Sequence, residues 1–414
     1  MTIYVDCTLT YERKITTGIQ RVVKKIIEYK SDDPHIIIVP IRFDGRGFLK
    51  VHPEQLKPTV ATNFIKIIRD LLVGTPLFFI GKKTFRSYLE YKSRLIAYIN
   101  SLKHLQIQKE DVILVADLVQ SEKYVKKLTE LRSQGYNVYQ IVFDILPLTH
   151  PQFFFDNDVV NFNAVAKSWK AYAKRVFAIS KKVASEVRTK LNISDVDYFY
   201  LGSDFKLLGD KKRINNLVFK DKSYFLVVGT IEPRKNHIQV LKTFFKIWED
   251  GYSDKLVFIG RLGWKYDEIL TFIRLAKSQY SDRFVWIQNA SDGELENYYK
   301  NAKGVVCASF DEGFGLPVVE ALSYSVNVIC SDIEVFREIG GDLCNYFQLE
   351  SEDKEKDSLY NTILHSSKKS GVDNYRPLSW NKAISALLNK ITSDASLTAQ
   401  VFQHKIDSRS QKQI

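Results

Sequence analysis

The 414-residue chain has few cysteines and no long apolar run, and each absence argues against a class of protein. Its four cysteines, Cys7, Cys307, Cys330 and Cys344, form no Cys-x-x-Cys pair, which argues against a zinc site or a dithiol redox centre. We interpret them as structural, because Cys7, Cys307 and Cys330 lie in apolar, strand-like segments where a thiol behaves as a small hydrophobe. No apolar run approaches 18 residues, so no membrane-spanning helix is expected.

The sequence also has no GxGxxG motif after an early strand, which argues against a hydride-transfer enzyme. The start MTIYVDCTL reads as a strand without a basic segment before it, so no signal peptide is visible and a cytoplasmic location is expected. At roughly 150 residues per domain, the length predicts two domains with large cores.

Positive charge is concentrated in the first half. Residues 1–205 hold 31 Lys and Arg against 21 Asp and Glu, a formal charge of +10, whereas residues 206–414 hold 29 against 27, a charge of +2. Two interpretations stay open: peripheral contact with an anionic inner-membrane face, and a lysine-rich solubilising surface. Residues 82–104 read as a basic amphipathic helix, suited to membrane contact or to packing on the domain. Nucleic acid is not an expected partner.

Short apolar runs alternate with amphipathic segments through both halves. The runs are TIYVDC, HIIIVPI, DVILVADL, YNVYQIVFDI, RVFAIS and DYFYLG, then SYFLVVGTI, KLVFIG, RFVWIQ, GVVCAS and NVICSD. Continuous apolar strands alternating with helices predict parallel sheets covered on both faces. We therefore expect an α/β fold of two doubly wound, Rossmann-like domains that face each other across a ligand-binding cleft.

A charged stretch divides the two halves. KLLGDKKRINNLVFKDK predicts a linker at residues 206–222, between an amino-terminal domain at 1–205 and a carboxyl-terminal domain at 223–390. Residues 391–414 read as a polar tail.

The strand YFLVVGT reaches Gly229 and is followed by IEPRKNH and a helical pattern. A glycine and two basic residues between a strand and a helix are suited to a phosphate. Arg234 offers a planar fork of donors and Lys235 a point charge, a combination that fits a diphosphate. A solvated helix start would explain the same residues.

A second loop, DEGFGLPVVEALS at residues 311–323, reads as a turn that opens a helix at Pro317. The backbone N–H groups at this helix start are suited to the same diphosphate. They belong to Gly313, Phe314, Gly315 and Leu316.

Two glutamates flank this turn in an otherwise apolar setting. Glu320 lies one turn inside the predicted helix, where its carboxylate can accept two hydrogen bonds from a vicinal diol such as ribose. Glu312 lies in the loop before the helix and faces another part of the ligand. A pair of solvated charges is the competing interpretation.

These segments, with LVFIGRLGW, DGELENYYKNAKGVVCASF and NVICSDIEVFREIGGD, resemble the carboxyl-terminal domain of the GT-B glycosyltransferases of family 4, which are retaining enzymes. Glu312 and Glu320 match that family's two glutamates separated by seven residues, and order and spacing agree over about 120 residues. LVFIGRLGW is similar to members that act in bacterial O-antigen and capsule assembly, several of which use mannose or rhamnose donors. The resemblance therefore favours GDP-mannose.

The amino-terminal half resembles the family more loosely, so that the resemblance spans roughly residues 1–390. TTGIQRVVKKI stands where relatives have a glycine-rich loop near the donor diphosphate, and only Gly18 remains of it. FDILPLTHPQFF stands where many relatives carry His-Asp, with the histidine touching the donor sugar. Here Phe143 replaces the histidine and Asp144 is kept. His150 either supplies an imidazole or caps the PLTHP turn.

The resemblance implies a role for each matched residue. Arg234 and Lys235 would neutralise the departing nucleoside diphosphate. Glu320 would hold the ribose, and Glu312 would bind hydroxyls of the transferred sugar and steady the anomeric centre. The co-substrates would be a nucleotide-sugar donor and a polysaccharide or lipid-linked glycan acceptor. SWNKAISALL resembles the family's closing helix, which packs back across both domains.

Two DxD triplets could suggest a metal site. They are Asp156-Asn157-Asp158 and Asp195-Val196-Asp197. Such triplets hold a divalent ion in the other major transferase fold, but these two lie near predicted helix or strand ends, where aspartates commonly cap. A basic pair stands in place of a metal, so we predict no metal and no cofactor.

Two other functions remain in view. A nucleotide-sugar epimerase or hydrolase would use the same two-domain architecture, since fold does not fix function. A partner subunit without activity would fit the substitution at Phe143 and the reduced glycine loop. The presence of Arg234, Lys235 and Glu320 argues for the transferase.

Overall fold

The structure is a computed structural model and describes residues 1–13, 18–56, 104–118, 121–203, 223–349 and 358–410. The chain divides into two compact units. The first unit comprises Met1–Ile141, Lys167–Phe177 and Ile384–Ile414, and the second comprises Val142–Ala166 and Ala178–Ala383. The domain boundaries predicted from the sequence stay predictions. The whole of the predicted linker at 206–222 lies outside the described residues, as does the helix predicted at 82–104 apart from its last residue.

A seven-stranded sheet has the order β3-β2-β1-β4-β5-β6-β7. Its strands are β1 Thr2–Asp6, β2 Ile37–Phe43, β3 Phe48–Lys50, β4 Val112–Val115, β5 Asn137–Val142, β6 Arg175–Ala178 and β7 Val196–Tyr198. The helices between them are α1 Thr8–Arg13, α2 Gly18–Glu28, α5 Glu122–Ser133, α6 Leu146–Thr149, α7 Asp156–Tyr172 and α8 Lys181–Leu191, with short 3-10 turns η1 Pro53–Leu56 and η2 Pro151–Phe153.

A six-stranded sheet in the second unit has the order β10-β9-β8-β11-β12-β13, and all its strand pairs are parallel. Its strands are β8 Tyr224–Val228, β9 Lys255–Ile259, β10 Phe284–Ile287, β11 Gly304–Cys307, β12 Asn327–Ser331 and β13 Asn345–Phe347. The accompanying helices are α9 His237–Glu249, α10 Asp267–Gln279, α11 Asp292–Asn301, α12 Leu316–Ser323, α13 Glu334–Gly340 and α14 Ser358–His365, with 3-10 turns η4 Pro233–Lys235, η5 Gly341–Leu343 and η6 Val372–Asn374.

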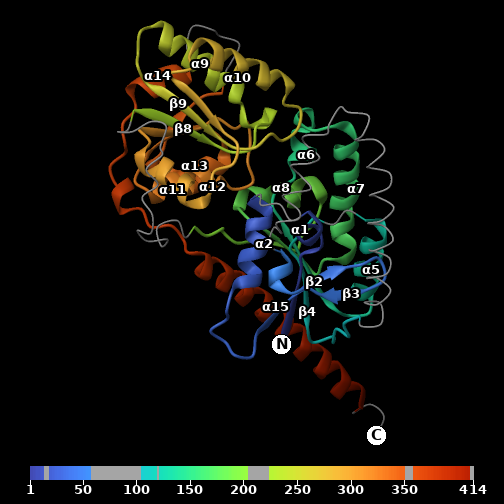
Figure 1. The fold of residues 1–414 in the computed structure, drawn as a ribbon. Coiled ribbons are helices and arrows are strands. Elements are labelled where there is room, and N and C mark those ends of the chain that lie inside the picture. Colours follow the sequence, from blue (N-terminus) through green and yellow to red (C-terminus); the bar gives the residue numbers. More distant parts are fainter. Residues whose placement is uncertain (14–17, 57–103, 119–120, 204–222, 350–357, 411–414) are drawn as a thin grey trace. The chain divides into compact units, whose positions relative to one another are not determined.

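The strands of this sheet are apolar on both faces because helices cover both. In β8, Phe225 packs in a core with α9, α10 and α14, whereas Tyr224 and Leu226 pack in a second core with α11, α12 and α13. Figure 1 shows α9, α10 and α14 on one side of β8 and β9, and α11, α12 and α13 on the other. Burial of both sheet faces explains why near-continuous apolar strands predicted this architecture correctly.

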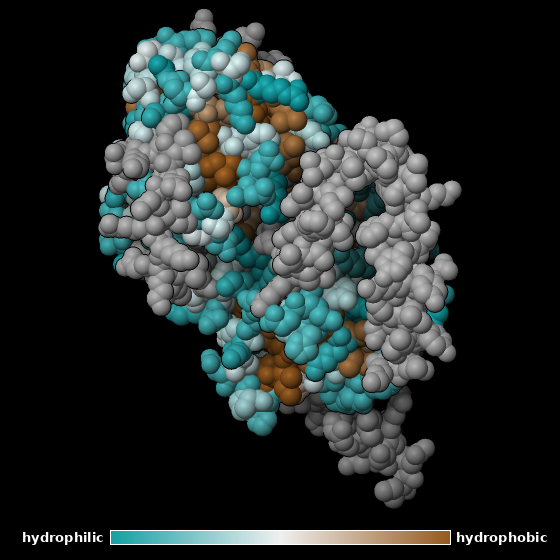
Figure 2. All heavy atoms as spheres, viewed as in Figure 1, coloured by the Kyte–Doolittle hydropathy of each residue, from teal (hydrophilic) through white to brown (hydrophobic). Residues whose placement is uncertain are grey.

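The four cysteines are free and buried, and Cys307, Cys330 and Cys344 belong to the core on the α11–α13 side. Figure 2 shows that the outer surface over α9, α10 and α14 is mostly hydrophilic. Amphipathic helices thus place their charged residues outward and their apolar stripe on the sheet.

One edge strand departs from the all-parallel expectation. β3 pairs antiparallel with β2 through the turn Asp44–Gly47. Gly45 has φ +94°, and the Asp44 carboxylate accepts from the amides of Arg46 and Gly47 at 3.0 Å each. A strand of three residues carries too little periodicity to be predicted, although the Asp-Gly pair is a hairpin signal.

The predicted closing helix is present as α15, Trp380–Ser410, and extends through residues assigned to a tail in the sequence prediction. In the first unit its Asp394 accepts a hydrogen bond from Tyr139 Oη at 2.8 Å. Asp394 also pairs with Lys174 at 3.0 Å and Arg175 at 3.2 Å. These contacts bind the helix to β5 and β6.

Candidate active site

The site lies in the second unit, where β8 and β11 end side by side. β8 leads through Gly229 into the turn η4, which carries Arg234 and Lys235. β11 leads into the loop 308–315 and then into α12. The strand order changes direction at this pair, and the carboxyl edge of such a switch point is where open α/β sheets bind ligands.

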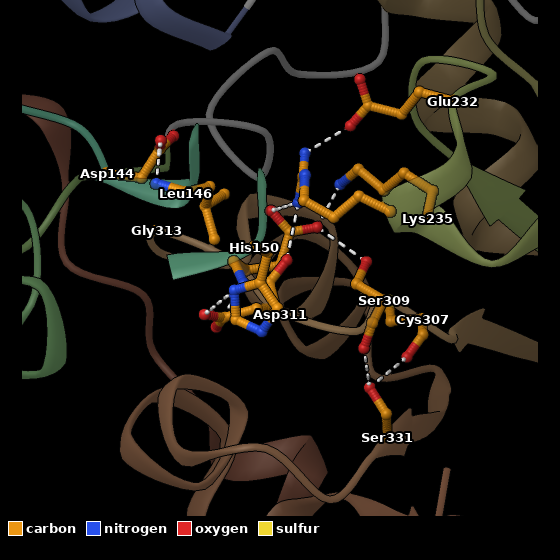
Figure 3. Close-up of polar contacts among 12 residues, drawn as sticks. Asp144, Leu146, His150, Glu232, Lys235, Cys307, Ser309, Asp311, Gly313 and Ser331 are labelled. Atoms are coloured by element: carbon orange, nitrogen blue, oxygen red, sulfur yellow. Dashed lines mark hydrogen bonds and ion pairs between the residues drawn. The ribbon is translucent and has the colours of Figure 1, made fainter. Parts of the chain in front are cut away.

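The two basic residues predicted from the sequence contact the predicted Glu312. Arg234 Nη1 lies 2.7 Å from Glu312 Oε2 and 2.7 Å from the carbonyl oxygen of Asp311. Lys235 Nζ donates to Glu312 Oε1. Lys235 is labelled in Figure 3, where a dashed line marks this contact. Residues 77 positions apart in the sequence therefore form one charged cluster, as their places after neighbouring strands predict.

The Glu312 carboxylate is fixed on its remaining sides. Ser309 Oγ donates to Glu312 Oε1 at 2.7 Å, and Ser331 Oγ donates to the Ser309 carbonyl at 2.6 Å. Burial would raise the pKa of Glu312, but Arg234 and Lys235 outweigh burial and hold the pKa at about 2. Glu312 is consequently ionised at any physiological pH.

Other carboxyl groups in the cluster behave differently. Arg234 Nη2 contacts Glu232 Oε1 at 2.5 Å, yet burial raises the pKa of Glu232 above its usual value despite Arg234 and Lys235. Burial likewise raises the pKa of Asp144, although Arg234 opposes it. The cluster therefore keeps one carboxylate strongly ionised and two others closer to protonation.

Gly313 brings the predicted Asp144 to the cluster. A Cβ atom at Gly313 would lie 2.1 Å from the backbone oxygen of Phe143, and Ser180 Oγ donates to the Gly313 carbonyl at 2.8 Å. Asp144 Oδ1 accepts from the Leu146 amide at 3.1 Å. Phe143, at the family's histidine position, is buried. The close backbone approach requires glycine at position 313.

The start of α12 has the predicted geometry. Gly315 caps the helix with φ +97°, Leu316 is its first residue and Pro317 follows. Phe314 is buried next to them. The left-handed conformation favours glycine at 315, and the first amides of a helix have no partner within it.

Glu320 lies in α12, is 3% exposed and accepts a hydrogen bond from Tyr299 Oη at 2.7 Å. The two glutamates of the motif thus have different surroundings. Glu312 is surrounded by cations, and Glu320 pairs with a phenol.

Gly229 lies beside the Lys235 side chain, since a Cβ at this position would meet Lys235 Cε at 3.3 Å. Gly18 begins α2 in the first unit, and residues 14–17 before it lie outside the described residues. Two buried aspartates that sequence analysis did not single out hold α1, just before this loop. Asp6 accepts from Thr8 Oγ1 and Asp117 from the Thr10 amide, each at 2.5 Å.

A second missed group surrounds Asp311. Lys182 of α8 donates to Asp311 Oδ2 at 2.5 Å and pairs with Glu186 at 2.9 Å. His150 Nδ1 lies 3.5 Å from the same Asp311 oxygen and 3.0 Å from Thr149 Oγ1. Burial lowers the pKa of His150, although Asp311 opposes it, so its imidazole is mainly neutral near pH 7. The structure therefore connects His150 to the Glu312 loop through Asp311.

The DxD triplets lie at element ends, as expected: Asp156 begins α7, and Asp195 immediately precedes β7. Over the residues that the structure covers, no group of three His, Cys, Asp or Glu side chains could hold a metal ion. The absence of a metal requirement remains a prediction. Among the same residues, no helix is both long and apolar enough to cross a membrane.

His237, the first residue of α9, should make stability sensitive to acid. Burial lowers its pKa to about 3, with Lys235 and Arg234 acting in the same direction. The unfolded chain binds this proton near pH 6.5, so the stabilisation is present above pH 6.5 and is lost as the pH falls toward 3, by about 1.4 kcal/mol per pH unit. We expect His237→Gln to flatten this loss.

The measurement is the thermal unfolding midpoint of both proteins at pH 7, 6, 5 and 4. The difference between the two profiles isolates His237 from the carboxyl groups, which titrate in both proteins. Parallel profiles would show that His237 does not carry the acid sensitivity.

Comparisons with known proteins agree with this geometry. The family model "Glycosyl transferases group 1" matches residues 210–366. The serotype-specific mannosyltransferase WbdA of Escherichia coli is 29% identical over 307 residues, which cover 68% of this chain and 37% of that protein. The O-antigen chain mannosyltransferase RfbU of Salmonella typhimurium is 29% identical over 211 residues, covering 50% of this chain and 55% of RfbU. The chain therefore spans only about a third to a half of these relatives.

Solved structures share the fold at low identity. Sucrose-phosphate synthase from Thermosynechococcus elongatus has a TM-score of 0.56 and 14% identity, covering 98% of this chain and 99% of that chain. Anabaena HepE in complex with UDP and glucose has a TM-score of 0.55 and 12% identity, covering 99% and 100%. Residues 210–366 therefore match the glycosyl transferases group 1 model, and the chain has the GT-B fold and is similar over part of its length to bacterial mannosyltransferases.

Proposed function

We propose that this chain is a retaining glycosyltransferase, which transfers a sugar from a nucleoside diphosphate donor to a bacterial glycan or lipid-linked glycan. The observation that carries the proposal is the cluster of Arg234, Lys235 and Glu312 at the switch point of the second sheet. A cationic pair at that edge suits a diphosphate leaving group, whose negative charge grows as the bond to the sugar breaks. The homology to O-antigen mannosyltransferases supports mannose, and thus GDP-mannose.

The hydrogen bonds of Arg234 and Lys235 indicate different roles for the two side chains. The Arg234 guanidinium donates to Asp311, Glu312 and Glu232. Among the described residues, Lys235 Nζ has one hydrogen-bond partner, Glu312. An ammonium has three donors, so Lys235 retains donors for phosphate oxygens while Arg234 mainly positions the carboxylates.

Glu312 is better suited to electrostatic stabilisation than to covalent attack. A carboxylate held at a pKa of about 2 by two cations is a weak nucleophile. Its negative charge beside the sugar would favour a cation-like anomeric centre. Asp144, with its raised pKa, would bind a hydroxyl of the transferred sugar.

Glu320 should contribute to nucleotide binding through the ribose. Glu320→Gln should weaken GDP binding by roughly 10- to 100-fold, since one or two hydrogen bonds to an anion are lost. Native protein should bind 2′-deoxy-GDP more weakly than GDP, whereas Glu320→Gln should bind the two nucleotides with similar affinity. Tyr299→Phe is the matched control, because it removes the bond at 2.7 Å and keeps the carboxylate. If Glu320→Gln prefers GDP over 2′-deoxy-GDP as strongly as native protein does, Glu320 does not bind the ribose.

Turnover of GDP-mannose with and without a mannose oligosaccharide tests the function. The transferase releases GDP in step with glycan elongation and forms a product with the donor's anomeric configuration, read from the one-bond carbon–proton coupling at C1 of the transferred sugar. Conversion of the donor without acceptor would favour an epimerase or hydrolase. Nucleotide binding without any conversion, across GDP, UDP and dTDP sugars, would favour an inactive partner subunit.

A further inference from the structure

Five aromatic side chains of the second unit gather beside His150 and Asp311. This aromatic patch consists of Phe153, Phe154, Phe155, Trp264 and Phe310. Phe153 stacks on Phe310 with ring centroids 5.0 Å apart, and Phe154 stacks on Trp264 at 5.6 Å. The residues come from η2 and the chain directly after it, from the β9–α10 loop and from the loop after β11, so tertiary folding assembles the patch.

Polar bonds fix the patch in place. Trp264 Nε1 donates to the Phe153 carbonyl at 2.8 Å, and Lys265 Nζ donates to the Gln152 carbonyl at 3.1 Å. Lys265 adopts φ +48°, a backbone conformation that is uncommon for a residue other than glycine. Strained residues of this kind cluster at ligand sites, because surrounding contacts hold them there.

The patch is open to solvent at two of its rings. Phe155 is 49% exposed and Phe310 is 36% exposed. Large aromatic side chains at the surface commonly mark binding sites when they are contiguous. The exposed Phe310 ring continues, through Phe153, into the half-buried part of the patch, and Phe155 joins the patch through Lys265, whose ammonium lies 5.6 Å from the centre of its ring.

The patch is continuous with the candidate active site. The Phe153 ring lies parallel to the His150 imidazole, with centroids 6.1 Å apart and an interplanar angle of 14°. The Phe310 amide donates to the Arg234 carbonyl at 2.9 Å. His150 in turn faces Asp311, as Figure 3 shows. An apolar surface therefore adjoins an imidazole and a carboxylate.

We propose that the aromatic patch and His150 bind a pyranose ring of the acceptor glycan, an inference that rests on the proposed function. A pyranose has an apolar face of C–H bonds, whose partial positive charge suits the negative face of an aromatic ring. Its hydroxyl groups lie around the edge, where a neutral imidazole and a carboxylate can bond to them. A lipid chain would gain nothing from the polar groups at this border.

The test is saturation-transfer NMR of the full chain with methyl α-D-mannopyranoside. We expect the protein to saturate the C–H protons of one sugar face. Phe310→Ala should reduce this signal roughly 2- to 10-fold, whereas Phe310→Tyr, which keeps the ring, should retain it. Tyr252→Ala is the matched control, since Tyr252 is 45% exposed in the same unit and outside the patch.

Binding of GDP and binding to anionic lipid vesicles, measured in parallel, show which of the two proposals fails if the sugar result is not as expected. If GDP binds and the native protein gives no sugar signal, or Phe310→Ala leaves the signal intact, the patch is not a pyranose subsite, and the proposed function stands. If GDP does not bind either, the proposed function itself fails. Loss of binding to anionic lipid vesicles in Phe155→Ser, with an unchanged sugar signal, would make the patch a membrane contact and overturn the proposal.

Discussion

Replacing Lys235 with methionine should lower kcat roughly 100- to 1,000-fold, the usual cost of removing one preorganised charge partner from a transition state. Lys235 has donors beyond its bond to Glu312, and phosphate charge develops only as the sugar departs. The acceptor KM should change little. The fold should persist, because Arg234 still pairs with Glu312 at 2.7 Å.

The measurement is the steady-state rate of GDP release with saturating acceptor. Lys300→Met is the matched control, because Lys300 also pairs with a glutamate, Glu296, at 2.7 Å, and lies in α11 away from the cluster. A variant Lys235→Met with native kcat would show that the ammonium does not act on the leaving group.

Replacing Gly313 with alanine should lower both stability and activity. The added Cβ would lie 2.1 Å from the Phe143 oxygen, so either the 308–315 loop or the Phe143–Asp144 backbone must shift. Overpacking of this kind costs roughly 1–3 kcal/mol, which lowers the unfolding midpoint by several degrees. The shift would also move Glu312 and Asp144 relative to each other, so kcat should fall as well.

Gly135→Ala is the control for Gly313→Ala, because it introduces backbone strain without steric overlap. Gly135 has φ +91° with no atom within 4 Å of the added Cβ, so its substitution carries only the conformational cost of about 1–2 kcal/mol. Scanning fluorimetry and the GDP-release assay give both readouts. Native kcat in Gly313→Ala would mean that the contact between Gly313 and Phe143 is unimportant for the site.

The central part of the site follows from the sequence because of strand order. Arg234 and Lys235 follow one apolar run, and Glu312 follows another. Parallel strands end at one edge, and a doubly wound order places β8 beside β11. Gly315 and Pro317 are equally predictable, because a left-handed cap and a first-turn proline are local preferences.

The groups around that centre are less predictable. Lys182 lies in a helical pattern that reads as a solvated face, and its partner Asp311 is 129 residues away. Glu232 and His237 flank the basic pair, but their burial depends on how η4 packs. The contact between Phe143 and Gly313 depends on backbone approach, which no side-chain pattern encodes. Such groups become visible only when tertiary packing is known.

The most direct test of the donor site is a calorimetric titration of native protein and of Lys235→Met with GDP, UDP, dTDP and ADP. Each titration is run once with EDTA and once with magnesium. We expect GDP to bind native protein without metal and more strongly than the other diphosphates, and Lys235→Met to weaken GDP binding at least tenfold, equivalent to about 1.4 kcal/mol. Absence of binding by every diphosphate, or equal binding by the variant, would contradict a donor site at Arg234, Lys235 and Glu312.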